Sequence, residues 1–292
     1  MNIAQREADV EDDRYVWFAN INYQFAEYNA EWEAYLGADH NRMANVAAAA
    51  AATRSNSPEV TYIVGTRAQF DPVENLTAGA EVALQLGDYY GGSGVTANPE
   101  RDRQAWAMDI FATYTWREMS YQPWLGLEYV HLSGDEAGSG DFEGWNGFFR
   151  GPTYGLIREY LDVIYQSALN SDSIASAPNA SANSQHIALS AGFKPMDDLA
   201  IDGTLYHFWL DEDVVVGPAG NSGQILGDSI GDEIDINVTY AYTEDVTFGL
   251  TLAWFLPGEL YEDYQPGSGG GVLNGGTDDK ATMVTSSVNV VF

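Results

Sequence analysis

The first regular pattern in the chain is an alternation of apolar and polar residues between Arg14 and Ala26. One side of this segment carries Tyr15, Trp17, Ala19, Ile21, Tyr23 and Phe25, and the other side carries Asn20, Asn22 and Gln24. A period of two residues places successive side chains on opposite faces of a β-strand. Residues 281–292 repeat the alternation, with Val284, Val288 and Val290 on one side. The pattern therefore predicts amphipathic strands near both ends of the sequence.

The same alternation recurs between these two segments, and it predicts an all-β fold. The further strands are expected at residues 30–36, 60–70, 76–86, 106–116, 123–132, 186–193, 199–210, 233–242 and 246–256. This pattern predicts about eleven strands in all. Residues 154–169 differ, because their apolar positions fit a helical period at least as well as a strand. If they formed a strand, the count would rise to about twelve.

The connections between the predicted strands alternate in length. Short turns follow every second strand, starting with the first, and long loops follow the others. Outer-membrane β-barrels have short periplasmic turns and long extracellular loops, and their strands pair antiparallel. A last strand that ends on an aromatic residue, here Phe292, is also typical of these barrels. These features predict one antiparallel transmembrane β-barrel domain over residues 1–292, located in the bacterial outer membrane.

The expected strand number has a consequence for closure of the barrel. With about eleven strands the first and last would run in the same direction, whereas single-chain bacterial barrels have an even number. We therefore expect further strands upstream of Arg14, or a second chain that completes the wall. Residues 1–13 are expected to be disordered or to be the remnant of an upstream loop. They lack the apolar core of a secretory signal, so we expect that a signal was removed or that the chain begins partway into a gene.

Composition adds further constraints. The sequence has no run of about 18 apolar residues, so only a barrel could cross a membrane. Cysteine is absent, which excludes disulfides, thiolate metal sites and cysteine nucleophiles. The formal net charge is −31, so we expect no nucleic-acid partner. Three interpretations of this acidity remain open: a solvated or salt-adapted surface, a negatively charged pore, and divalent-cation bridges to lipopolysaccharide.

Four segments together carry a family resemblance. They are Leu127–Asp135 (LEYVHLSGD), the run GWNGFFRGP that follows it, Leu199–Glu212 (LAIDGTLYHFWLDE), and Gly231–Glu262 with its GDEID strand and FLPGE strand end. In this order they resemble the C-terminal region of the alginate-export family of outer-membrane porins, over residues 120–292. The resemblance implies that this chain is part of a larger barrel of about 18 strands. It also implies passive passage of a polysaccharide or another solute through a lumen lined by charged side chains.

The polar faces of the predicted strands name the residues expected to line the lumen and to set its selectivity. They are Glu31, Glu33, Arg67, Glu81, Asp109, Glu128, Asp202, Glu233 and Asp235, with Arg117 near a turn. A porin for a polyanion such as alginate would need Arg and Lys at such positions. Because the carboxylates predominate, we expect a lumen that prefers cationic or neutral solutes, a saccharide among them.

Residues 133–183 are expected to form a long loop. Its segment 144–160 (GWNGFFRGPTYGLIREY) combines aromatic and basic side chains. If the loop folds into the lumen, this segment would be a constriction or a surface along which a sugar slides. The residues expected to form it are Trp145, Phe148, Phe149, Arg150, Tyr154 and Arg158. The alternative is an external loop that packs on the rim of the barrel.

Other functions were weighed against a channel. His131 and Ser133 resemble the His-x-Ser of the outer-membrane phospholipase family, but Gly134 and Asp135 stand where that family has Asn-Gly. We therefore expect no enzyme and no cofactor, with loop carboxylates at 135–143 and 211–213 as candidates for bound calcium. The expected partners are outer-membrane lipid, lipopolysaccharide and the solute. Two alternatives are a barrel that scaffolds a partner protein and a soluble β-sandwich.

Overall fold

The structure is a computed structural model. It describes residues 14–26, 29–41, 59–89, 101–136, 138–147, 154–158, 182–213, 215–216, 224–225, 227–263 and 279–291. Its strands are β1 (Arg14–Phe25), β2 (Ala30–Asn41), β3 (Glu59–Val73), β4 (Leu76–Tyr89), β5 (Arg101–Thr115), β6 (Trp124–Leu132), β7 (Ser184–Met196), β8 (Leu199–Trp209), β9 (Val215–Val216), β10 (Gln224–Ile225), β11 (Ser229–Ala241), β12 (Val246–Pro257) and β13 (Ala281–Val290). The short helix α2 spans Glu259–Asp263. The all-β prediction is confirmed.

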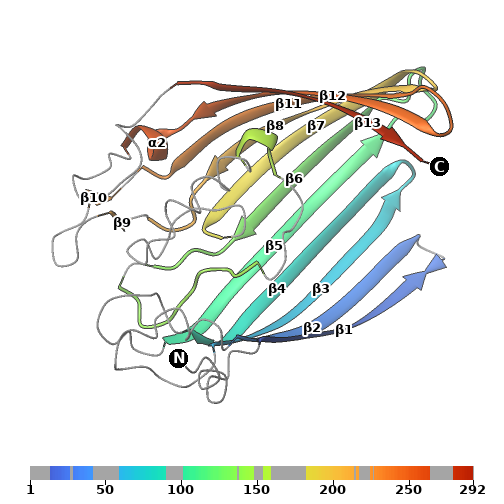
Figure 1. Cartoon of the computed structure of the whole chain (residues 1–292). Coiled ribbons are helices and arrows are strands. Elements are labelled where there is room, and N and C mark those ends of the chain that lie inside the picture. Colours follow the sequence, from blue (N-terminus) through green and yellow to red (C-terminus); the bar gives the residue numbers. More distant parts are fainter. Residues whose placement is uncertain are drawn as a thin grey trace, which may run out of the picture.

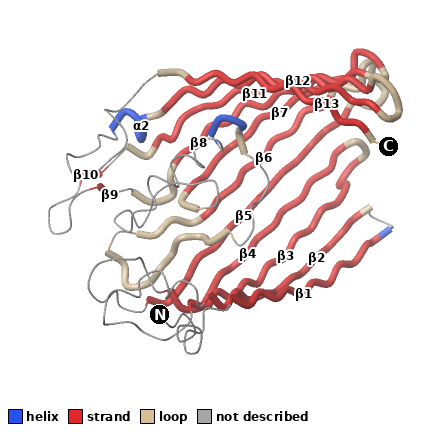
Figure 2. The backbone as a smooth tube through the Cα atoms, in the orientation of Figure 1, coloured by secondary structure: helices blue, strands red, loops and turns tan. Residues whose placement is uncertain are grey.

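The strands form one antiparallel sheet of 11 strands in the order β1-β2-β3-β4-β5-β6-β7-β8-β11-β12-β13, beside a separate β9–β10 hairpin. Each strand of the sheet pairs with its sequence neighbours, apart from the excursion through β9 and β10 between β8 and β11. The sheet curves into an open trough in which short turns lie at one end and long connections at the other (Figures 1 and 2). β1 and β13 are its two edges and, within the described residues, do not pair with each other.

The register separates two faces that follow from the alternation in the sequence. The outward face carries large apolar side chains that are exposed on every strand of the sheet, including Trp17, Leu36, Leu84, Leu127, Leu205 and Val288. The inward face, on the concave side of the trough, carries most of the charged side chains of the strands. An exposed apolar surface of this extent on a folded protein marks contact with lipid or with another chain. No helix among the described residues is long and apolar enough to cross a bilayer.

The strands extend further toward the long loops than the alternation alone predicted. β2 continues to Asn41, because Asp39 on its inward side binds Arg14 of β1 through two hydrogen bonds of 2.8 and 2.5 Å. β3 and β4 are joined by a two-residue turn, in which Asn75 adopts a φ of 69°. Asn tolerates this left-handed conformation better than most residues. Residues 156–158 begin a helical turn outside the sheet, and residues 159–169 lie outside the described residues.

A small hydrophobic core lies on the inward face, at the long-loop end of β8, β11 and β12. It consists of Ile157, Phe208, Leu210, Ile230, Ala253, Phe255 and Leu260. Leu260 belongs to α2, and Ile157 belongs to the long connection between β6 and β7. The connection is therefore folded against the wall here, which brings residues far apart in sequence to one place.

Candidate functional site: the inward face and the segment folded against it

A row of charged residues crosses the inward face of β2, β3, β4 and β5. The register places Glu33 opposite Arg67, Arg67 opposite Glu81, and Glu81 opposite Asp109. Directly opposed residues of neighbouring strands have Cβ atoms about 4.5–5.5 Å apart. Three carboxylates and one guanidinium therefore form one continuous line, which we call the charged row.

Neighbouring polar groups orient the charged row. The amide of Asn20 donates a hydrogen bond of 2.8 Å to Glu33, and the hydroxyl of Tyr35 donates one of 2.5 Å to Glu81. Tyr35 reaches Glu81 across β3 because Gly65 lies directly beneath its ring, where a Cβ would be 2.3 Å from the ring. The glycine thus gives the tyrosine its path to β4.

The other predicted lumen residues fall in three places. Glu31, Glu128 and Asp202 lie on the inward face, and Asp202 accepts a hydrogen bond of 3.0 Å from Asn237. Arg117 lies in the turn between β5 and β6, beyond the sheet. Glu233 and Asp235 also lie on the inward face, but they are 0 % and 8 % exposed. These two acids are therefore covered, and the residues that cover them come from the β6–β7 connection.

Residues 154–158 form the cover. Glu233 accepts hydrogen bonds from the backbone N–H of Ile157 at 2.6 Å and from that of Arg158 at 2.9 Å, one on each carboxylate oxygen. Asp235 accepts one from the N–H of Leu156 at 3.1 Å. Three consecutive backbone donors are thus held by two carboxylates of one strand. Backbone donors at the start of a helical turn have no partner within the turn and need such acceptors.

Aromatic contacts fasten the side chains of the same segment. The guanidinium of Arg158 lies 4.6 Å from the ring centroid of Phe208, and the ring of Tyr154 lies 4.4 Å from that of His186. Burial, together with the carboxylates of Asp109, Glu128 and Glu81, raises the pKa of the Tyr154 phenol above its ordinary value. Tyr154 therefore faces the acidic part of the wall as a neutral hydroxyl.

An earlier part of the same connection is fastened to β4 and β5. The side-chain amide of Gln85 donates to the carbonyl of Asn146 at 2.6 Å and accepts from its N–H at 2.9 Å. Arg103 binds Glu59 at 2.9 Å and the carbonyl of Gly144 at 3.2 Å, and its guanidinium lies 4.8 Å from the centroid of Phe142. Trp145 lies within this fastened part. Phe148, Phe149 and Arg150, which we expected in a constriction, lie outside the described residues.

The His131 and Ser133 pair has a structural environment. Ser133 is 3 % exposed, and its Oγ donates to the carbonyl of Glu143 at 2.6 Å and accepts from the N–H of Trp106 at 3.0 Å. The ring of His131 stacks on Trp106 with centroids 3.9 Å apart. A hydroxyl committed to two backbone groups is poorly placed to act as a nucleophile.

The acidic loop residues bind protein groups. Asp135 accepts two hydrogen bonds from Arg101, at 3.0 and 2.8 Å, and Asp211 accepts one from the N–H of Gly134 at 2.9 Å. Within the part of the chain that the structure describes, no group of three or more His or carboxylate side chains is arranged as metal ligands. These acids therefore hold the loops at the rim.

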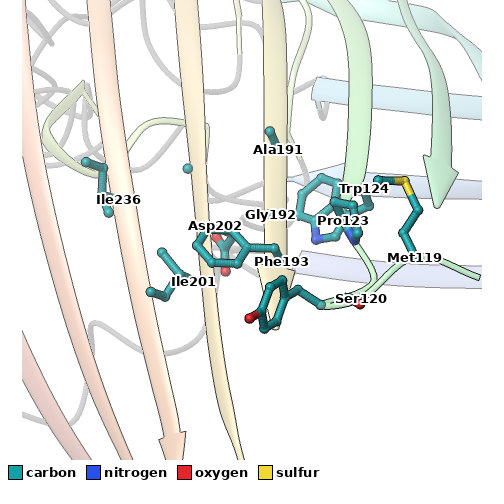
Figure 3. Close-up of a pocket in the computed structure, with 12 residues that line it drawn as sticks. Met119, Ser120, Pro123, Trp124, Ala191, Gly192, Phe193, Ile201, Asp202 and Ile236 are labelled. Carbon is teal, nitrogen blue, oxygen red and sulfur yellow. The ribbon is translucent and has the colours of Figure 1, made fainter. Parts of the chain in front are cut away.

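A hollow of about 610 Å³ lies at the opposite, short-turn end. It is lined by the β5–β6 turn, including Met119 and Tyr121, and by Phe193, Ile201 and Ile236 of β7, β8 and β11 (Figure 3). By register, Ile201 and Ile236 belong to the outward face, whereas Trp124 and Asp202, which also line the hollow, belong to the inward face. The hollow is mainly apolar and lies away from the charged row.

Comparison with known proteins decides the family. The family model for alginate export matches residues 1–272. The chain belongs to the alginate export family. It is accordingly a bacterial outer-membrane β-barrel porin, and its family points to a transport channel. The resemblance seen in the sequence is confirmed.

The similarity to solved structures is remote, and no curated protein matches the chain. One similar structure is described as "NanC porin structure in rhombohedral crystal form", with 9 % identity and a TM-score of 0.37 over 96 % of this chain and 95 % of that one. Another comes from a study headed "Unveiling the Mechanism Behind the in-meso Crystallization of Membrane Proteins", with 11 % identity and a TM-score of 0.35 over 95 % and 76 % of the two chains.

Proposed function

We propose that this porin conducts cationic and neutral solutes, saccharides among them, along an acidic inner wall. The observation that carries the proposal is the charged row, in which one guanidinium stands among three carboxylates. Glu128 adds a fourth carboxylate one strand further on, diagonal to Asp109. A lumen lined by one sign of charge attracts counter-ions and excludes co-ions. A polyanion would be repelled by this wall, so alginate itself is a poor solute for the part of the porin described.

Other arginines of the inward face do not offset this acidity. Arg14 is paired with Asp39, Arg103 with Glu59, and Arg101 with Asp135. Each pair is neutral overall and lies toward the long-loop end. The carboxylates of the charged row therefore remain the main charges available to a permeating ion at mid-height.

Aromatic rings on the same face favour a saccharide as the neutral solute. Four of them lie directly over a glycine of the neighbouring strand, namely Phe18 over Gly37, Tyr35 over Gly65, Phe111 over Gly79 and Trp124 over Gly192. A ring seated on a glycine turns its opposite face toward the inner space. Aromatic faces attract the C–H groups of a sugar ring, while neighbouring carboxylates accept hydrogen bonds from its hydroxyls.

The folded segment gives the passage its proposed constriction. Tyr154 and Arg158 are held against β7, β8 and β11, and Trp145 belongs to the stretch held against β4 and β5. The connection thus has anchors on both sides of β6, which favours a loop inside the trough over one packed only on its outer rim.

We also propose that the outward apolar face contacts lipid, with lipopolysaccharide at the long-loop end, and that residues 1–292 act as one wall domain. β1 and β13 run in the same direction, so an antiparallel closure between them requires an odd number of additional strands. A second copy inserted in the same orientation would meet these edges in parallel. The mass of the detergent-solubilised protein gives the number of chains in a particle. A particle that contains this chain alone and conducts after reconstitution into a bilayer would contradict this part of the proposal.

The test is ion selectivity in planar lipid bilayers. The purified porin is placed between salt solutions of unequal concentration, and the reversal potential is measured. A reversal potential whose sign shows that cations permeate better than anions supports the acidic lumen. The opposite sign refutes it. Complete absence of conductance supports the scaffold alternative. Liposome swelling with a neutral sugar, an amino sugar and a sugar acid then ranks the solutes, and fastest entry of the sugar acid would also refute the proposal.

A further inference from the structure

We propose that Glu233 is a latch that holds residues 154–158 against the wall and so sets the width of the passage. The inference rests on the proposed constriction and deepens it by assigning a positioning residue. Glu233 was expected from sequence to line the lumen and select ions. Its 0 % exposure and its two backbone partners point to a different task.

The first argument is the chemistry of the two carboxylate oxygens. Oε1 accepts the N–H of Ile157 and Oε2 accepts the N–H of Arg158. A carboxylate offers two acceptor oxygens, whereas a glutamine side chain offers one oxygen and one NH₂ donor. Glutamine at this position would therefore leave one backbone N–H facing another donor. Leaving a buried donor unsatisfied is more costly than losing an exposed hydrogen bond.

The second argument is the fit of the segment itself. Gly155 has a φ of +76°, and a Cβ there would lie 2.7 Å from Oε2 of Glu233 and 3.1 Å from the ring of Phe208. A residue with a side chain would be strained by the backbone conformation and would collide with the latch. Glycine at 155 and glutamate at 233 are thus two halves of one contact.

The third argument is that neighbouring carboxylates are not equivalent to Glu233. Asp235 accepts one backbone group of the segment, the N–H of Leu156, through Oδ2. Asparagine at 235 keeps one acceptor oxygen and can retain this single bond. Asp202 lies on the adjacent strand of the same face and binds Asn237 instead of the segment. Of these three carboxylates, Glu233 is the one that holds two consecutive backbone groups of the described segment.

Because the protein has no cysteine, a single introduced thiol can report whether residues 154–158 detach from the wall. Ile157 is 3 % exposed, and Ile157→Cys would be the sole thiol of the protein. Its reaction with a water-soluble maleimide is measured in the full chain in detergent and in liposomes. In an Ile157→Cys/Glu233→Gln protein we expect the reaction to be at least about tenfold faster than in Ile157→Cys alone. This factor corresponds to a loss of about 1.4 kcal/mol in the free energy that keeps the segment docked against the wall. Gly155→Ala tests the same contact from the side of the segment, with no substitution in β11, and we expect an increase in the same direction.

Two matched controls and a second measurement decide the inference. Asp202→Asn and Asp235→Asn in the Ile157→Cys background should leave the rate within about twofold. Single-channel conductance should rise in Glu233→Gln and stay unchanged in Asp232→Asn, because the side chain of Asp232 lies on the outward face. Equal thiol rates in all variants would overturn the latch, and a faster rate without a change in conductance would overturn its control of the passage. If no variant conducts, the proposed channel function fails, while the thiol rates still decide whether Glu233 holds the segment.

Discussion

Neutralising the charged row is the most direct test of how the porin selects ions. The perturbation is the pair Glu81→Gln and Asp109→Asn, which removes two directly opposed carboxylates while keeping side-chain volume. At about 5 Å in a water-filled lumen, one carboxylate stabilises a monovalent cation by about 0.8 kcal/mol. Screening at physiological salt, with a Debye length of about 8 Å, reduces this to about 0.5 kcal/mol.

Together the two substitutions should cost a permeating cation about 1 kcal/mol, which is a roughly fivefold drop in cation permeability. Because the same carboxylates repel anions, the ratio of cation to anion permeability should fall by at least this factor. The assay is the reversal potential under a salt gradient, measured at low and high ionic strength. The effect should shrink as salt rises, because screening shortens the reach of the row. Asp232→Asn with Glu244→Gln is the matched control, since it removes the same charge from an outward-facing position and a short turn. Unchanged selectivity in Glu81→Gln/Asp109→Asn would refute the reasoning.

Three further predictions follow from single contacts. Arg67→Gln should increase cation preference about twofold, since it removes the one guanidinium of the charged row, and the reversal potential would reveal no change or a decrease if this is wrong. Phe208→Ala should lower the free energy of unfolding by roughly 3–5 kcal/mol, because it removes a fully buried ring from the small core, and denaturant unfolding of the reconstituted protein measures this. The pKa of Tyr154 is raised, so its neutral form stabilises the fold below about pH 10 and this stability is lost as pH rises further. Thermal unfolding between about pH 9 and 11 should therefore depend less on pH in Tyr154→Phe than in the unaltered protein, and equal slopes would contradict the assignment.

The strands and their two faces followed from the sequence because the signal is local. Each strand exposes apolar groups on one side and polar groups on the other, so a period of two is visible without knowledge of the fold. Turn lengths then supplied antiparallel order. Strand ends were less well predicted, because β2 extends as far as a cross-strand pair between Arg14 and Asp39 supports it.

The aromatic–glycine pairs show where the sequence pattern stops being informative. Phe111 and Gly79 are each ordinary members of a strand, and only their direct opposition in register seats one on the other. Register between strands depends on the whole ladder, so no local period contains it. The same holds for Gln85, a polar position of the predicted strand 76–86, and for Arg103, which lies before the predicted strand 106–116. Their roles appear only when the loop carbonyls at 146 and 144 are placed beside them.

By itself the sequence determined that this protein forms an antiparallel β-sheet with one apolar and one acidic face, because alternation and turn length are local properties. Only the tertiary structure decided which acids face an open passage and which are covered. Glu233 and Asp235 carry the same alternation as Glu81, but the residues that bury them lie 75 to 79 positions earlier. The exposure of a side chain depends on which segment folds over it. The sequence of the covering segment does not indicate which strand it will contact.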